Sequence, residues 1–265
     1  MTTSPRTTVL ITGAGSGMGL ETARLLARDG AAVALLGRRQ EALDSVADTI
    51  RAEGGTALAL AADITDADDV TRVLDRVRTE LGPVDVLVNN AGSASSVLNP
   101  QWLPHDEWRQ VLDVNLTAVF QLTQAVLPDM LDRGAGTIVT VSSLAAVNPN
   151  LLGGAAYGAA KAGVRNFMTF LHNTFRNQGL RAITVLPGEA DTPILDNRAR
   201  PPAPEERAAM LRPEDVAEAI RLAVALPQRV VLQEIVVAPT HQRDVSADLD
   251  ISRWAGAPAD AAPQA

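Results

Sequence analysis

The stretch Thr12-Gly13-Ala14-Gly15-Ser16-Gly17-Met18-Gly19 decides the fold. It follows a short apolar run, residues 8–12, and leads directly into an amphipathic helical pattern over residues 20–28. Glycines here permit a tight turn, and the N-terminus of the following helix offers unpaired N–H groups to a pyrophosphate. This position between a first strand and a first helix predicts a nucleotide-binding turn. An ATP-type phosphate loop would end in Gly-Lys-Ser/Thr, and no lysine is present here.

Seven short apolar or β-branched runs alternate with longer helical patterns along the chain. They are residues 8–12, 32–36, 57–60, 84–88, 137–141, 181–186 and 230–237. Such alternation predicts parallel strands joined by right-handed crossovers, with helices on both faces of the sheet. The predicted fold class is therefore α/β, a doubly wound Rossmann fold with a seven-stranded parallel sheet. An eight-stranded barrel would need one more strand.

The composition describes an ordinary globular chain of 265 residues, with 46% hydrophobic and 20% charged residues. The absence of cysteine excludes disulfides, thiolate zinc sites and cysteine nucleophiles. The histidines are too scattered to predict a metal site; they are His105, His172 and His241. Twenty-three basic against thirty-one acidic residues give a net charge of −8, which argues against general nucleic-acid binding.

Targeting and membrane signals are not found in the sequence. No apolar run approaches the roughly 18 residues of a membrane span, and residues 1–8 lack the apolar region of a signal peptide. We therefore expect a cytoplasmic protein without a membrane partner.

The chain is expected to form one domain over residues 1–240, followed by a tail over residues 241–265. A proline-rich segment at 188–212 interrupts the alternation, and loops of that length are usually lids or binding loops. We expect its part from 194 to 210 to fold over the ligands. The tail has too little apolar content to fold by itself, which predicts a partly disordered, mobile terminus. Ile251 and Trp254 could dock its first half on the body or on a neighbouring subunit.

The glycine spacing, Gly-x-x-x-Gly-x-Gly preceded by threonine, resembles that of the short-chain dehydrogenase/reductase family. Further segments carry the same resemblance, and it runs from about residue 8 to residue 240. These segments are Asp63-Ile64, Asn89-Asn90-Ala91-Gly92, Ser142-Ser143, Tyr157-Gly-Ala-Ala-Lys161, Pro187-Gly188 and Thr192. The resemblance implies a nicotinamide dinucleotide as cofactor. The residues expected to bind it are Gly13, Gly15, Ser16, Gly17, Met18, Gly19, Arg38, Arg39, Asp63, Ile64, Asn90, Ala91, Gly92, Tyr157, Lys161, Pro187, Gly188 and Thr192.

The end of the second predicted strand indicates which dinucleotide binds. Folds that prefer NAD place an acid there to hold the ribose 2′-hydroxyl, whereas this chain has Gly37-Arg38-Arg39. A guanidinium binds phosphate through charge-assisted hydrogen bonds, so the sequence favours NADP over NAD. Arg38 is the preferred contact and Arg39 the second. The alternative is a pair of solvated arginines at a helix start.

Tyr157 and Lys161 stand four residues apart on a predicted helix, on one face and about 6 Å apart along its axis. A nearby positive charge favours the phenolate, as acid–base work near neutral pH requires. The resemblance implies that Tyr157 protonates the substrate oxygen and that Ser143, rather than Ser142, hydrogen-bonds it. It also implies that Asn115 helps to hold a water chain to Lys161.

Other polar and aromatic residues are assigned weaker roles. Trp102, His105 and Trp108 flank the helix bearing Asn115, where capping or packing is the simpler role, and Glu189 sits where a substrate or nicotinamide could meet it.

The helix bearing Tyr157 is apolar over roughly 180°, more than the stripe of about 100° that covers a sheet. The excess face predicts contact with a helix from another subunit, and the family resemblance implies a homodimer or homotetramer; the alternative is burial beneath a helix of the same chain.

The leading hypothesis is an NADP-dependent carbonyl reductase or alcohol dehydrogenase acting on a small-molecule ketone, aldehyde or secondary alcohol. The first alternative is an NAD-dependent secondary-alcohol or polyol dehydrogenase. The second is an NADP-sensing regulatory protein without turnover, against which the intact Ser143, Tyr157 and Lys161 count. Among substrates, β-ketoacyl thioesters, quinones, steroids, sugars and hydroxy acids all remain open, because a fold does not determine a substrate.

Overall fold

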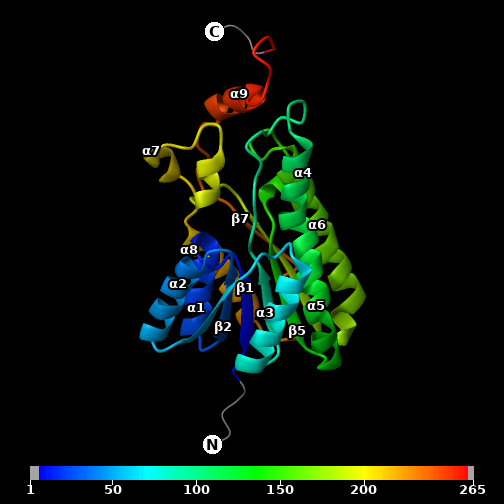
Figure 1. The fold of residues 1–265 in the computed structure, drawn as a ribbon. Helices are drawn as coiled ribbons and strands as arrows, with labels where there is room; N and C mark the ends of the chain where they lie inside the picture. The colour runs from blue at the N-terminus through cyan, green and yellow to red at the C-terminus, as the bar shows by residue number, and fades with distance from the viewer. Residues whose placement is uncertain (1–5, 262–265) are drawn as a thin grey trace, which may run out of the picture.

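The computed structural model describes residues 6–261, and its core is one parallel sheet of seven strands in the order β3-β2-β1-β4-β5-β6-β7. Figure 1 shows this sheet in the lower half of the molecule, between two groups of helices. The strands are β1 Thr8–Thr12, β2 Ala32–Gly37, β3 Thr56–Ala61, β4 Val86–Asn89, β5 Gly136–Val141, β6 Leu180–Pro187 and β7 Glu234–Val237. The predicted doubly wound fold is confirmed.

Alternation of side chains along the strands builds two apolar cores, one on each face of the sheet. In β1, Val9 and Ile11 belong to the core under α1, α2 and α8, whereas Leu10 belongs to the core under α3, α5 and α6. All three side chains are fully buried, because a parallel sheet is covered on both faces. These helices span Gly17–Arg28 (α1), Gln40–Ala52 (α2), Ala67–Glu80 (α3), Ala118–Asp132 (α5), Ala155–Phe175 (α6) and Pro213–Ala225 (α8).

The helix α4 (His105–Leu112) leads into α5 through a wider π-helical turn, η1 (Asp113–Thr117). Further along the described chain lie three short 3-10 helices: η2 (Leu144–Ala146) after β5, η3 (Arg176–Gln178) after α6 and η4 (Pro193–Asn197) after β6.

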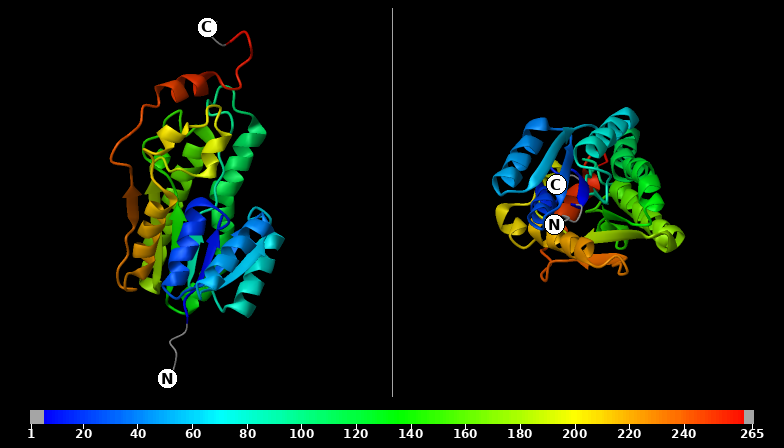
Figure 2. Two further views of the ribbon diagram at one scale, coloured as in Figure 1. Left: turned by 90° about the vertical axis from the view of Figure 1, so that its left-hand side faces the viewer. Right: turned by 90° about the horizontal axis from the view of Figure 1, so that it is seen from below.

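Beyond the carboxyl ends of the strands lies a separate layer built by the segment 188–212 and by the chain after β7. The segment 188–212 contains η4 and α7 (Pro204–Arg207), and an isolated parallel bridge between Ala190 and Leu211 closes its base. The tail forms a helix, α9 (Ser246–Trp254), which lies across the top of this layer in both side views (Figures 1 and 2).

The seven predicted strands are all found, with the largest difference at β7, which begins at Glu234 instead of residue 230. No helix between residues 6 and 261 is long and apolar enough to cross a membrane. The prediction that no signal peptide is present depends partly on residues 1–5, and the prediction of a mobile terminus depends partly on residues 262–265. Both segments lie outside the described residues.

Candidate active site

A cleft of about 1060 Å³ opens at the carboxyl ends of the strands, where β1 and β4 meet and the strand order changes direction. Ligands of open α/β sheets bind at this topological switch point. Gly13 and Arg38 line one end of the cleft, and Tyr157 and Lys161 line its middle. Arg198 lines the other end and belongs to the segment 188–212, which is called the lid from here on.

The glycine turn brings its backbone close to the end of β4. Gly13 has a φ of +66°, and a Cβ there would lie 3.0 Å from the Ala91 Cα atom. A Cβ on Gly19 would lie only 2.4 Å from the Gly13 carbonyl oxygen. These two positions therefore require glycine. The Ser16 side chain, at the N-cap of α1, makes no capping hydrogen bond within the described chain, so the first N–H groups of α1 stay available to an anion.

Hydrogen bonds from the Thr12 hydroxyl clamp this turn to β4. The hydroxyl oxygen accepts from the backbone N–H groups of Asn90 (3.0 Å) and Ala91 (2.9 Å) and donates to the Val88 carbonyl oxygen (3.4 Å). The Asn90 amide donates to the Thr12 carbonyl oxygen at 2.9 Å. Thr12 therefore supports the turn, a role that its place in the glycine motif did not predict.

Of the two arginines after β2, only Arg38 lines the cleft; Arg39 is the N-cap residue of α2. The Arg38 side chain makes no hydrogen bond with another described residue and lies near Asp63. Hydrogen bonds from the Thr65 N–H and hydroxyl, assisted by the Arg38 charge, lower the pKa of the Asp63 carboxyl. An exposed, unpaired guanidinium at this place suits an added phosphate.

Tyr157, near the N-terminus of α6, and Ser143, which follows β5, both line the cleft. Burial raises the pKa of the Tyr157 hydroxyl, and the nearby Ser143 side chain and the Arg198 charge oppose that rise. The Ser142 hydroxyl instead donates to the Lys161 carbonyl oxygen at 2.9 Å. The structure therefore gives the two serines different partners and sets Ser143 beside the tyrosine.

Lys161 lies one helical turn after Tyr157 and is buried. Its Nζ is 5.4 Å from the centre of the Tyr157 ring and donates to the Val141 carbonyl oxygen at 2.8 Å. Burial lowers the pKa of Lys161 to about 8, so most of its ammonium groups are charged at neutral pH.

Asn115 lies in η1, the π-helical turn between α4 and α5, rather than in a regular α-helix. Its amide donates to the carbonyl oxygens of Ser93 and Val111, both at 2.8 Å. Its own Oδ1 is buried without a hydrogen-bond partner among the described residues. Gly92 lies between this amide and the lysine, since a Cβ there would be 3.0 Å from Oδ1 and 3.7 Å from the Lys161 Nζ. Turns of this kind are frequent at functional sites.

The structure brings most of the predicted site residues to the cleft wall. Those lining it are Gly13, Ser16, Gly17, Met18, Arg38, Asp63, Ile64, Asn90, Ala91, Gly92, Ser143, Tyr157, Lys161, Pro187, Gly188 and Thr192. The remaining predicted residues, Gly15, Gly19, Arg39 and Asn115, do not line the cleft.

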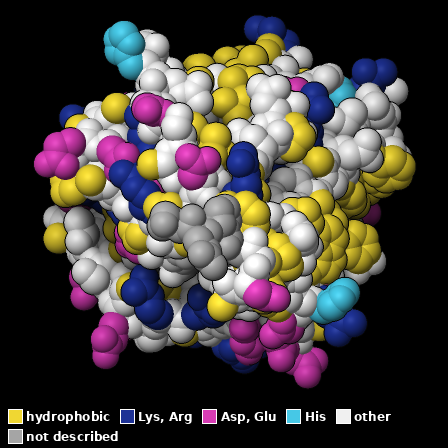
Figure 3. Space-filling model, turned by 90° about the horizontal axis from the view of Figure 1, so that it is seen from above, with side chains coloured by type: hydrophobic (Ala, Val, Ile, Leu, Met, Phe, Trp, Pro, Cys, Tyr) yellow, Lys and Arg dark blue, Asp and Glu magenta, His cyan; other side chains and the backbone are white. Residues whose placement is uncertain are grey.

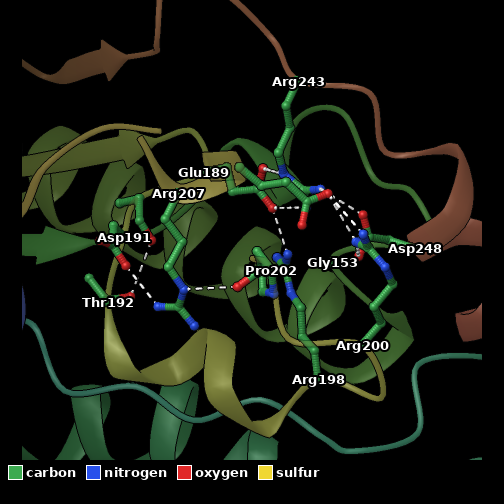
Figure 4. Close-up of polar contacts among 12 residues, drawn as sticks. Gly153, Glu189, Asp191, Thr192, Arg198, Arg200, Pro202, Arg207, Arg243 and Asp248 are labelled. Carbon is green, nitrogen blue, oxygen red and sulfur yellow. Dashed lines mark hydrogen bonds and ion pairs between the residues drawn. The ribbon is translucent and has the colours of Figure 1, made fainter. Parts of the chain in front are cut away.

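Glu189, which the sequence placed where a substrate or nicotinamide could meet it, lines the lid end of the cleft, but its charged partners there were not predicted. Glu189 lies between Arg198 of the lid and Arg243 of the tail, and Figure 4 shows both guanidinium groups directed at its carboxylate. Periodicity gives no signal for such partners, because Arg243 is 54 residues from Glu189.

The residues present fit a dinucleotide. The glycine turn lies so close to the end of β4 that side chains on its glycines would fill the space for a pyrophosphate. The first turn of α1 offers N–H groups to that pyrophosphate, and the volume of the cleft suits a large ligand. The fold and the site define a dinucleotide-dependent oxidoreductase.

Comparison with known proteins identifies the family. The family model described as short chain dehydrogenase matches residues 7–202, and the chain belongs to the short-chain dehydrogenase/reductase family. It is 42% identical over 217 residues to the cis-4-hydroxycyclohexanecarboxylate dehydrogenase of Sinomonas cyclohexanicum, covering 80% of this chain and 86% of that protein.

Two solved structures show the same fold. An alcohol dehydrogenase from Thermococcus sibiricus, complexed with 5-hydroxy-NADP, has a TM-score of 0.81 and 29% identity over 90% of this chain and 99% of its own. A 3-ketoacyl-(acyl-carrier-protein) reductase from Brucella melitensis, complexed with NADH, has a TM-score of 0.78 and 30% identity over 89% and 98%. The resemblance drawn from the sequence motifs is confirmed.

Proposed function

We propose that this oxidoreductase uses NADP to interconvert a ketone or aldehyde with the corresponding alcohol. The observation that carries the proposal is the grouping of Ser143, Tyr157 and Lys161 midway along a cleft that starts at the glycine turn. When bound, the nicotinamide supplies or accepts the hydride.

Tyr157 is the proposed general acid. Burial raises the pKa of its hydroxyl, so Tyr157 is protonated and able to donate, and the positive charge of Lys161 would have to oppose this rise for proton transfer near neutral pH. Ser143 would donate a hydrogen bond to the same oxygen and stabilise the developing negative charge. Lys161 would provide a positive charge beside the phenolate once the proton has left, and in alcohol oxidation the phenolate would take the proton back.

Arg38 is the proposed discriminator between NADP and NAD. Its guanidinium lines the cleft without a hydrogen-bond partner among residues 6–261 and would hold the 2′-phosphate. NAD use is the alternative, favoured by Asp63 beside Arg38 and by the NADH complex of the Brucella reductase.

Titration with NADPH and NADH, followed by turnover of a panel of carbonyl compounds, tests both parts of the proposal. We expect NADPH to bind more tightly and Arg38→Ala to weaken NADPH by about 10- to 100-fold, equivalent to the loss of charge-assisted hydrogen bonds of roughly 1.5–3 kcal/mol. NADH should change far less, and Arg39→Ala is the matched control. Equal losses for the two cofactors would refute the phosphate contact.

We also infer that the chain assembles as a homodimer or homotetramer through α5 and α6. Phe120 on α5 is 46% exposed and Phe170 on α6 is 58% exposed, and the Phe120 ring contacts the Phe167 ring of α6 with centroids 6.0 Å apart, so the two helices share an apolar surface that a second copy could cover. Sedimentation as a monomer at micromolar concentration would contradict this inference.

A further inference from the structure

The inference concerns the three charged side chains that face the cleft at its lid end. Arg198 Nη1 donates to Glu189 Oε1 at 2.6 Å. Arg243 binds the same carboxylate with two hydrogen bonds, from Nε to Oε2 (2.7 Å) and from Nη2 to Oε1 (2.8 Å). Burial raises the pKa of the Glu189 carboxyl, but these hydrogen bonds outweigh the effect of burial and hold the pKa below its ordinary value. The carboxylate is therefore ionised at neutral pH.

Arg243 is fully occupied by its protein partners. Its third nitrogen donates to Asp248 of α9 at 2.7 Å and to Glu206 at 3.3 Å, and Arg200 binds both of those acids from the other side. Glu206, Asp248 and Arg200 do not line the cleft. Arg243 therefore serves to hold Glu189 and to tie the lid to α9 (Figure 4).

Arg198 differs from Arg243 because it has donors to spare. Within residues 6–261 its Nε and Nη2 make no hydrogen bond, and its side chain keeps 18% exposure in the cleft. Its charge also acts on the Tyr157 hydroxyl, so the guanidinium lies near the reacting centre. A guanidinium with a free edge matches a planar carboxylate.

The whole group balances in charge, with Arg198, Arg200 and Arg243 against Glu189, Glu206 and Asp248. On the cleft side two guanidinium groups face one carboxylate, and the unused donors of Arg198 are the ones that a ligand anion could meet. The charged residues on the α4 side, Asp106, Arg109 and Asp113, are exposed and screened by water. Seen from above, this end of the molecule has acidic and basic side chains intermixed (Figure 3), so selection of an anion must come from an individual cation.

We propose that Arg198 binds the carboxylate of the substrate, and that the substrates are keto or hydroxy carboxylic acids on a compact apolar frame. The apolar part would pack against Leu98, Leu152, Ile194 and Met210, which line the cleft. The name of the Sinomonas relative describes a hydroxy acid of this kind. The proposal rests on the proposed function and adds its substrate class.

The test compares one ketone with and without its charge, 4-oxocyclohexanecarboxylate and its methyl ester. In Arg198→Gln the ratio of kcat/KM for the acid to that for the ester should fall by about 10- to 100-fold, the loss expected when a charge-assisted hydrogen-bonded pair is removed. Any effect of Arg198 on Tyr157 acts on both substrates and cancels in the ratio. Glu189 keeps Arg243, so the variant leaves no buried carboxylate unpaired. Arg198→Lys should retain part of the ratio.

Arg207→Gln is the matched control, because Arg207 is a lid arginine paired with Asp191 and Asp196 that does not line the cleft. Its acid-to-ester ratio should stay that of the wild type. An equal fall in both variants, or no fall in Arg198→Gln, would overturn the proposal.

Binding gives a second readout that does not depend on turnover. Calorimetry should show cyclohexanecarboxylate binding the wild-type protein more tightly than cyclohexanecarboxamide, with the difference lost in Arg198→Gln. Turnover of cyclohexanone without turnover of the acid would defeat this inference and leave the proposed function standing. Failure to reduce any carbonyl compound would defeat both.

Discussion

The two ends of the cleft are held together by different kinds of interaction. The cofactor end consists of glycines, backbone groups and strand termini, held by short contacts such as that of Thr12 with Asn90 and Ala91. The lid end consists of ion pairs between segments that are distant in the chain, such as Glu189 with Arg243. The close backbone contacts at the cofactor end leave little room for larger side chains. The lid end depends on charges, which other charged residues could supply. The cofactor end thus suits a constant ligand, and the lid end suits a variable one.

The largest effect we expect is on the chemistry between the two ends. Tyr157→Phe removes only the hydroxyl and should lower turnover by about 10³-fold or more, since general acid–base groups contribute roughly 10² to 10⁴. Cofactor affinity, measured by fluorescence titration, should remain within a few-fold of wild type, because the glycine turn is untouched. Turnover above a tenth of the wild-type rate would exclude Tyr157 as the proton donor.

We expect a smaller effect on the free energy of unfolding, caused by the buried Lys161 in the middle of the cleft. Burial lowers the pKa of Lys161 to about 8 from its ordinary value of 10.5. Between these values the unfolded chain binds a proton that the folded chain releases, so the free energy of unfolding rises with pH, and below pH 8 the full penalty remains.

Lys161→Met removes this titration and is the reference for it. Denaturant unfolding at pH 7 and pH 9.5 should show wild type gaining about 2 kcal/mol relative to the variant over that interval, part of the roughly 3 kcal/mol that the whole shift represents at 1.36 kcal/mol per pKa unit. Parallel pH profiles for the two proteins would mean that the lysine is not desolvated in this way.

The smallest effect should be confined to the lid end. Asp248 is buried on α9; burial raises the pKa of its carboxyl, but Arg243 and Arg200 lower it more. Asp248→Asn should weaken the attachment of α9 by about 1.5 kcal/mol. Amide hydrogen exchange in α9 should then be roughly tenfold faster while exchange in β1 stays unchanged. Asp250→Asn, an exposed acid of the same helix, is the control. Faster exchange in β1 as well would mean that the two ends are not independent.

Much of the fold could be predicted because its signals are local. Each buried strand is a run of apolar or β-branched residues, and the glycine turn marks β1 and α1 by its own sequence. The predicted start of β7 lies four residues early because Val230, Val231 and Leu232 form an apolar run just before the strand. In the structure, the Val230 carbonyl oxygen instead accepts a hydrogen bond from the buried Arg181 side chain.

The candidate site could be predicted at its cofactor end and centre but not at its lid. Ser143, Tyr157 and Lys161 belong to motifs that keep fixed spacing, and the structure groups them. Arg198, Arg243 and Asp248 have no such spacing. The low apolar content of the tail predicted partial disorder, with Ile251 and Trp254 as the residues that could dock its first half, yet Ile251 is 44% exposed and ion pairs of Asp248 with Arg200 and Arg243 hold α9 in place. Opposite charges can pair across any separation in the chain, so composition does not indicate which pairs form.

The tie between Glu189 and Arg243 has a consequence for the order of events during synthesis. The two residues are 54 positions apart, so at about 5–20 residues per second Arg243 is added roughly 3 to 11 seconds after Glu189. During that interval β1 to β6 already exist as polypeptide, whereas the partner that secures Glu189 does not. The lid end of the cleft is consequently completed last in the nascent chain, after β1 to β6 have been made.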